Sequence, residues 1–254
     1  MSILSLQNCS IKFGGLVAVS DLCLEIEADD LLGLIGPNGA GKTTVFNFIT
    51  GVYQPTSGRV VFNGKDLAGL KPHQISALGI ARTFQNIRLF PSLTVYETVQ
   101  VALRKNIRYG FMQAVVRPNS LFQQEREINE TIKEILNFFG LLPYQREMAT
   151  ALPYGIQRRV EIVRALATKP RLLLLDEPAA GMNPAEKNEL MGLIGQVREH
   201  YRCAVFLIEH DMKVVMGICE RIAVLDYGIK IAEGIPREIQ NNPKVVEAYL
   251  GEKA

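Results

Sequence analysis

The chain begins with a pattern in which apolar and polar side chains alternate. The alternation is loose over residues 3–13 and regular over residues 22–28, and residues 59–67 surround the pair Asn63-Gly64. A period of two is typical of strands that bury one face, and Asn-Gly between apolar residues is typical of a tight hairpin. The first part of the chain is therefore predicted to form antiparallel β-structure.

Three short runs are apolar throughout, which indicates strands buried on both faces. They occupy residues 31–36, 171–176 and 203–209. Such strands belong to parallel sheets that helices cover on both sides. Helical periodicity follows each run, at residues 42–50, 185–199 and 211–219.

The middle and the end of the chain have patterns of their own. Residues 95–141 are mostly helical in periodicity, with an interruption at residues 116–120, and residues 221–234 form a second hairpin pattern before short closing helices. The whole pattern predicts an α/β fold with a mostly parallel sheet and flanking helices. An N-terminal antiparallel β subdomain and a helical subdomain are expected beside that core.

Composition narrows the class of protein. Of 254 residues, 48% are hydrophobic and 21% charged, and the net charge is +2 without a basic stripe, so a nucleic-acid partner is not expected. The four cysteines show no metal spacing and are expected to be reduced core residues. The chain shows no signal-peptide pattern and no run of eighteen apolar residues. These features predict a soluble intracellular chain that is still able to dock on a membrane protein.

The stretch GPNGAGKTT, residues 36–44, fits the phosphate-loop pattern between a predicted strand and a predicted helix. Glycines let backbone N–H groups face an anion, and the start of the helix adds a partial positive charge. Lys42 is expected to reach the β- and γ-phosphates of a nucleotide, and Thr43 to ligate Mg²⁺. The predicted phosphate-binding residues are Gly36, Pro37, Asn38, Gly39, Ala40, Gly41, Lys42, Thr43 and Thr44.

Polar residues follow the other predicted strands of the same sheet. Asp176 ends one strand and is expected to hold Mg²⁺, and the adjacent Glu177 is expected to orient or deprotonate a water molecule. His210 follows the next strand and is a candidate contact for the γ-phosphate. Gln85 follows a short strand-like segment and is a candidate ligand of Mg²⁺ or of the water. Ligand sites in open α/β sheets lie at these carboxyl ends.

The order of these motifs resembles the nucleotide-binding domain of ATP-binding-cassette (ABC) proteins along essentially the whole chain. The phosphate loop, Gln85, LPYGIQRR, LLLLDEP, GMNP and His210 follow the order of that family's Walker A loop, Q-loop, signature, Walker B, D-loop and switch histidine. The resemblance implies a P-loop NTPase fold, ATP and Mg²⁺ as cofactors, and Phe13 stacked on adenine. Ala18 is a second candidate for that face.

In this family two domains pair head to tail, and each signature helix points at the γ-phosphate held by the other subunit. Pro153 is expected at the first helical position, and Gly155 is expected to let the backbone approach that phosphate. The signature residues implied by the resemblance are Leu152, Pro153, Tyr154, Gly155, Ile156 and Gln157. The family commonly has L-S-G-G-Q here and aspartate in place of Asn183, and the departures fit a pair of unequal sites.

The resemblance also implies a division of the single domain, residues 1–254. Residues 1–85 and 157–254 form the RecA-like core with the antiparallel β subdomain, and residues 86–156 form a helical subdomain that ends in the signature. In the family, the region of residues 86–99 forms the groove that receives a helix from the membrane subunit. This region is expected to contact a permease.

Several segments are similar to the ATP-binding subunits of branched-chain amino acid importers: residues 13–22, 104–128, 152–166 and 246–252. This likeness implies two permease subunits, a second, non-identical cassette, an external solute-binding protein, and a place on the cytoplasmic face of the inner membrane. Urea or amide import and lipopolysaccharide export stay open as alternatives. So do a cassette ATPase of DNA repair or translation, and a P-loop kinase, which would not explain the signature helix or His210.

Overall fold

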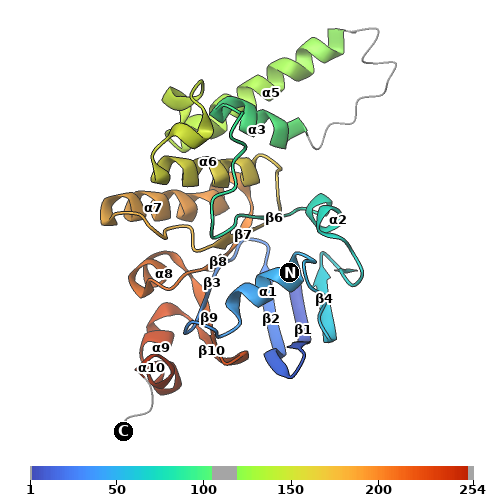
Figure 1. Ribbon diagram of the computed structural model, residues 1–254, viewed down its shortest axis with the longest axis vertical. Coiled ribbons are helices and arrows are strands. Elements are labelled where there is room, and N and C mark those ends of the chain that lie inside the picture. Colours follow the sequence, from blue (N-terminus) through green and yellow to red (C-terminus); the bar gives the residue numbers. More distant parts are fainter. Residues whose placement is uncertain (1, 105–118, 251–254) are drawn as a thin grey trace. The chain divides into compact units, whose positions relative to one another are not determined.

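The computed structural model of the protein describes residues 2–104 and 119–250 (Figure 1). The interruption predicted at residues 116–120 and the similar segment at residues 104–128 lie partly outside these ranges. Contacts divide the chain into two compact units, Met1–Gln85 with Arg171–Ala254 and Asn86–Pro170. Each unit is described by itself.

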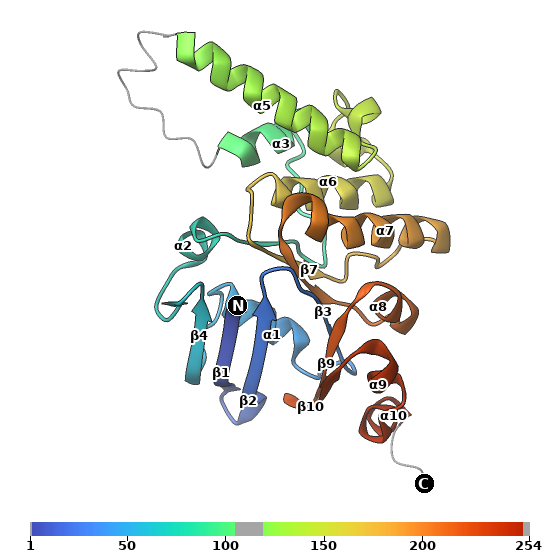
Figure 2. The same ribbon diagram turned by 180° about the vertical axis from the view of Figure 1, so that it is seen from behind.

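The first unit contains two sheets (Figure 2). One is antiparallel in the order β2-β1-β4-β5, and the other has the order β10-β9-β3-β8-β7-β6, in which only β10 runs antiparallel. The strands are β1 (Ser2–Phe13), β2 (Leu16–Glu27), β3 (Leu31–Ile35), β4 (Ser57–Phe62), β5 (Lys65–Asp66), β6 (Ile80–Arg82), β7 (Leu172–Asp176), β8 (Ala204–Ile208), β9 (Arg221–Asp226) and β10 (Ile229–Gly234). The predicted antiparallel and mostly parallel sheets are both confirmed.

Burial explains why the apolar runs form the middle of the larger sheet. Every residue of β3, β7 and β8 is buried, whereas buried and exposed residues alternate along the second half of β2. Phe46 and Phe206 meet in the core with ring centroids 5.0 Å apart. The helices of this unit are α1 (Lys42–Ile49), α2 (Pro72–Ala77), α7 (Pro184–Tyr201), α8 (Met212–Ile218), α9 (Pro236–Gln240) and α10 (Pro243–Leu250). All except α2 were expected.

The second unit is helical. It contains α3 (Val95–Arg104), α5 (Asn119–Phe138), α6 (Tyr154–Leu166) and the short 3-10 turns η1 (Leu142–Tyr144) and η2 (Ala149–Ala151). Helix α3 packs against both α5 and α6. The sequence-based division ended the helical part at residue 156, but α6 runs across that point. Because α6 packs on α3, residues 157–170 group with the helical unit.

The structure bears on membrane-spanning segments and on the positions of the four cysteines. No helix within the described ranges combines the length and the apolar character needed to cross a bilayer. Cys9, Cys203 and Cys219 are buried, and none of the four cysteines forms a disulfide. The prediction of a core position is wrong for Cys23, which lies on the exposed face of β2.

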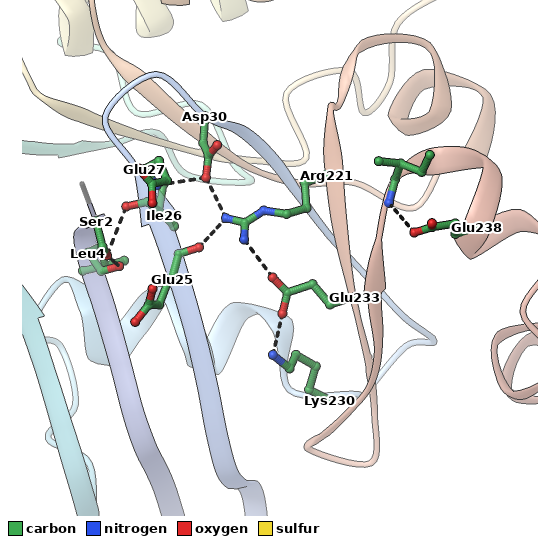
Figure 3. A network of polar contacts seen from close by, with 11 residues as sticks. Ser2, Leu4, Glu25, Ile26, Glu27, Asp30, Arg221, Lys230, Glu233 and Glu238 are labelled. Carbon is green, nitrogen blue, oxygen red and sulfur yellow. Dashed lines mark hydrogen bonds and ion pairs between the residues drawn. The ribbon is translucent and has the colours of Figure 1, made fainter.

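Arg221 joins the two sheets of the first unit at the start of β9 (Figure 3). Its guanidinium lies 2.6 Å from Asp30 Oδ2, between β2 and β3, and 3.0 Å from Glu233 Oε1 on β10. It also donates to the backbone carbonyl of Glu25 on β2. One side chain thus fixes the turn that leads from the antiparallel sheet into the parallel sheet.

Arg221→Met is expected to destabilise the first unit. The variant removes the Arg221 donors, so Asp30 keeps only the Glu27 N–H and Glu233 only Lys230. Charge-assisted hydrogen bonds at a partly exposed site contribute about 1–2 kcal/mol. The melting temperature should fall by about 2–8 °C. Arg104→Met is the control, because Arg104 pairs with Glu125 at 4.0 Å with both side chains exposed. Equal melting temperatures for the two variants in thermal unfolding would contradict the stabilising role of Arg221.

Candidate functional site

The loop between β3 and α1 has a backbone that requires glycine at its end. Gly41 is the N-cap of α1 with a φ of 100°, and a Cβ atom there would lie 2.6 Å from the Ala18 carbonyl oxygen. Gly41 therefore lets the loop lie directly against β2. The backbone of residues 36–41 leads straight into the first turn of α1, where N–H groups of a helix are unpaired.

Lys42 is folded into this loop. Its side chain is buried, and Nζ donates to the carbonyl oxygens of Gly36 at 2.7 Å and Pro37 at 2.9 Å. Burial lowers the pKa of the ammonium group, and the negative charges of Glu177 and Asp176 oppose that shift. The cation is thus held at the loop by its own backbone and faces the two acids that end β7.

Asp176 ends β7 in a buried position and is paired with Arg82. Arg82 Nη2 lies 2.9 Å from Asp176 Oδ2, and Nη1 donates to Asn47 Oδ1 on α1 at 2.7 Å. The guanidinium also lies over the ring of Phe84, 5.2 Å from its centroid. Sequence reasoning missed Arg82, although a charged residue at the end of a buried strand was a visible signal.

Glu177 brings two other predicted residues together. Gln85 Nε2 donates to Glu177 Oε2 at 3.0 Å, and His210 Nδ1 lies 3.7 Å from the same oxygen. Glu177 has a φ of 47°, which a residue with a side chain rarely adopts, and its N–H donates to the Ile208 carbonyl. Backbone strain of this kind concentrates at functional sites because it aims a side chain.

A cavity of about 510 Å³ opens in front of the loop. Of the predicted residues, Phe13, Ala18, Asn38–Thr44, Gln85 and Glu177 line it, and Gly36, Pro37, Asp176 and His210 do not. Sequence reasoning missed three lining residues, Leu16, Val17 and Tyr227. Phe13 is 42% exposed and meets Tyr53 edge to face at 5.0 Å, which leaves part of an aromatic surface at the rim.

The far end of the chain also reaches the loop. Burial raises the pKa of the Tyr249 hydroxyl on α10, and a hydrogen bond from the Gly36 backbone opposes that shift. Gly36 is the first residue of the phosphate-loop pattern. Sequence reasoning missed Tyr249, because nothing in the local pattern of α10 points to Gly36, which lies 213 positions earlier in the chain.

The signature residues lie in the second unit, at the start of α6. Pro153 was predicted at the first helical position, and this is wrong by one residue. Its ψ of 150° is extended, so Pro153 is the N-cap and α6 begins at Tyr154. Pro153 and Tyr154 are exposed, Leu152, Ile156 and Gln157 are half-buried, and Gly155 is buried.

Side chains of α6 hold the segment that leads into the helix and its first turn. Gln157 Nε2 donates to the carbonyl oxygens of Thr150 at 3.1 Å and Leu152 at 2.7 Å. The Tyr154 hydroxyl accepts a hydrogen bond from Arg158 at 3.1 Å, and Arg158 pairs with Glu161 at 2.8 Å, both fully buried. The tyrosine that departs from the family pattern therefore has a structural partner.

Comparison with known proteins gives matches along the chain. The family model "ABC transporter" matches residues 19–180, and the model "Branched-chain amino acid ATP-binding cassette transporter" matches residues 230–254. The high-affinity branched-chain amino acid transport ATP-binding protein LivG of Escherichia coli (strain K12) is 45% identical over 250 residues, 98% of each chain. BraF of Pseudomonas aeruginosa, which carries the same description, is 44% identical with the same coverage.

A solved structure of an ATP-binding cassette has the same fold as this chain. The ADP conformation of MJ1267, an ATP-binding cassette of an ABC transporter, superposes with a TM-score of 0.84 and 30% identity, and the match covers 99% of this chain and 100% of that one. The family match spans the phosphate loop, the signature and Walker B, and the first unit brings the loop, Gln85 and Glu177 to one cavity. The chain belongs to the ABC transporter family and is one of its ATP-hydrolysing subunits.

Proposed function

We propose that the protein is the ATP-binding subunit of an importer of branched-chain amino acids. The observation that carries this proposal is the likeness to LivG and BraF along almost the whole chain. Both relatives are named for branched-chain amino acid transport. The C-terminal segment adds to it, because residues 230–254 fit a family model named for the same transporters. The substrate itself would be selected by other subunits.

In this proposal ATP occupies the cavity in front of the phosphate loop. The adenine stacks on the exposed part of Phe13, the phosphates accept hydrogen bonds from the backbone of residues 38–44, and Lys42 turns a donor toward the β- and γ-phosphates. A lysine ammonium has three donors, so it is able to bind phosphate while keeping a link to the loop carbonyls.

The donor set fits Mg²⁺. The ion prefers oxygen ligands and is usually held by one or two carboxylates, waters and substrate phosphates. Within the described ranges there is no group of three or more acidic, histidine or cysteine residues that could hold a metal by itself. The Thr43 hydroxyl and the Gln85 amide oxygen, whose residues line the cavity, would supply two protein ligands. Asp176 does not line the cavity and has Oδ2 paired with Arg82, so it would take part through its other carboxylate oxygen. Bound there, the ion would neutralise phosphate charge.

The chemistry falls to Glu177 and His210. A water molecule attacks the γ-phosphorus, Glu177 accepts a proton from it, and the bond between the γ-phosphorus and the bridging oxygen of ADP breaks. Gln85 holds the Glu177 carboxylate by a hydrogen bond, and His210 lies beside the same oxygen. His210 then contacts the γ-phosphate. General base catalysis of this kind contributes about 10²–10⁴-fold.

A complete site in this proposal needs a second cassette. The exposed start of α6, at Pro153 and Tyr154, faces the γ-phosphate bound by a non-identical partner, and residues 86–99 receive a helix of a permease. The protein then lies on the cytoplasmic face of the membrane, attached through two permease subunits, and an external solute-binding protein delivers the substrate. The departures in the signature support unequal subunits.

The substrate proposal is tested by uptake. Cells that lack this chain should lose most uptake of radiolabelled leucine, isoleucine and valine, and the wild-type chain should restore it. Lys42→Ala should not restore it, because phosphate affinity falls when the ammonium is removed, as calorimetry with ATP would show. Normal uptake in the deleted cells, or a defect in urea uptake or in lipopolysaccharide export instead, would overturn the substrate assignment.

Glu177→Gln should keep ATP binding and lose at least about 100-fold of turnover in the assembled complex. The amide has the shape of the carboxylate, but it does not accept a proton. Phosphate release and calorimetric ATP affinity are the two measurements. Glu199→Gln is the control, because the side chain of Glu199 is 76% exposed. If Glu177→Gln turns over like the control, Glu177 is not the base.

The role of the α6 start is tested by two caps that differ in charge. Pro153→Ser and Pro153→Asp both introduce a side chain that caps a helix. Only aspartate brings a negative charge, which favours a helix start but repels phosphate. Like charges about 4 Å apart cost about 1–4 kcal/mol, so Pro153→Asp should lower turnover in the assembled complex by about tenfold to a thousandfold. If the two variants have similar turnover rates, no phosphate lies at this helix start in the assembled complex.

A further inference from the structure

Glu209 is a buried carboxylate to which the ATPase scheme above gives no task. It follows β8 directly, and 1% of the residue is exposed. Burial raises the pKa of its carboxyl group, while hydrogen bonds from the backbone of Ala179 and His210 oppose the shift. A carboxylate at such a position is costly unless polar partners surround it.

The two oxygens of Glu209 bind two different loops. Oε1 accepts the Ala179 N–H at 2.9 Å, and Oε2 accepts the His210 N–H at 3.2 Å. Ala179 belongs to the turn that follows Glu177, and His210 belongs to the loop after β8. The Glu177 N–H also donates to the Ile208 carbonyl at 2.9 Å. A side-chain bridge and a backbone bridge therefore connect the same two loops.

The carboxylate also lies beside the His210 ring. His210 Nδ1 is 3.9 Å from Glu209 Oε2 and 3.7 Å from Glu177 Oε2. The histidine side chain is 56% exposed, so its own packing does not hold the ring in place. Its backbone N–H is bonded to Glu209, and its ring nitrogen lies between the carboxylates of Glu209 and Glu177.

The bridge requires a carboxylate. Both of its partners are N–H donors, and a carboxylate offers two acceptor oxygens at the spacing needed to reach both. The amide of glutamine has one oxygen, so its NH₂ group would face one of the two donors. An aspartate keeps the charge but is one methylene shorter, and it would reach only the adjacent His210 N–H.

We propose that Glu209 is a positioning residue for ATP hydrolysis, which bridges the turn after Glu177 to His210 so that the base and the switch histidine approach the γ-phosphate as one unit. This inference rests on the roles proposed above for Glu177 and His210. Glu209 itself contacts neither nucleotide nor water in this scheme. Its effect reaches the reaction through the Ala179 and His210 backbone.

The bridge is tested first in the full chain alone, by hydrogen exchange of single amides. In Glu209→Gln, the amide of Ala179 or of His210 should exchange at least tenfold faster than in the wild type, and amides in β1 and β2 should not change. In Glu209→Asp, only the Ala179 amide should exchange faster. Glu199→Gln should change neither. If both amides stay protected in Glu209→Gln, the bridge is not what holds the loops.

Kinetics in the assembled complex separate positioning from general stability. Glu209→Gln should lower kcat about tenfold, which corresponds to about 1.4 kcal/mol, and change KM for ATP less than twofold. In the His210→Ala background, the same change should lower kcat by clearly less than tenfold, because the contribution through the His210 side chain is already lost and only the contribution through the Ala179 turn to Glu177 remains. A full additional tenfold loss there, or an unchanged kcat in Glu209→Gln, would overturn the proposal.

The Glu177→Gln variant distinguishes the two levels of inference. If Glu177→Gln abolishes turnover but Glu209→Gln does not alter it, the positioning role fails and the proposed ATPase scheme stands. If both Glu177→Gln and Glu209→Gln have normal turnover, the assignment of Glu177 as the base is wrong, and the positioning role that rests on it is wrong as well. Glu209→Asp provides a second variant in which the buried charge is kept, so a folding defect of Glu209→Gln does not leave the proposal without a test.

Discussion

The pairing of three buried parallel strands sets the position of the phosphate loop, of Glu177 and of His210. Leu34 on β3 lies opposite Ile208 on β8, and Ile208 lies opposite Asp176 on β7. One row across the sheet therefore delivers the phosphate loop, Glu177 and the Glu209-His210 pair to the same edge. Because these strands are apolar and buried throughout, the side chains that stabilise the sheet are also those that aim its polar ends.

The register brings three carboxylates close together, and each has a different kind of partner. Asp176 has the Arg82 guanidinium, Glu177 has the Gln85 amide, and Glu209 has two backbone N–H groups. Buried charges need such partners, and the partners also limit where the carboxylates point. The acids are thus oriented by the protein itself, which is the condition under which fixed charges stabilise a reaction most.

Local spacing explains why the phosphate loop, the buried strands and the two acids at the end of β7 were predictable from the sequence. Each depends on residues within one strand, turn or helix. Arg82, Tyr249 and the bridge of Glu209 were not predictable in the same way, since Arg82 and Asp176 are 94 positions apart and meet only through the order of strands. The start of α6 was misplaced by one residue because proline tolerates both the N-cap and the first helical position.

One departure from the family pattern, Asn183 in place of aspartate, changes the charge of a helix cap without removing the cap. Asn183 caps α7 by accepting the Glu186 N–H at 3.0 Å, with Pro184 in the first turn. Aspartate caps a helix about as well as asparagine, so the cap alone does not select the neutral residue. An aspartate would add a negative charge to the turn that already follows Asp176 and Glu177. Asparagine therefore keeps the cap of α7 and adds no charge to a turn that already follows two acids.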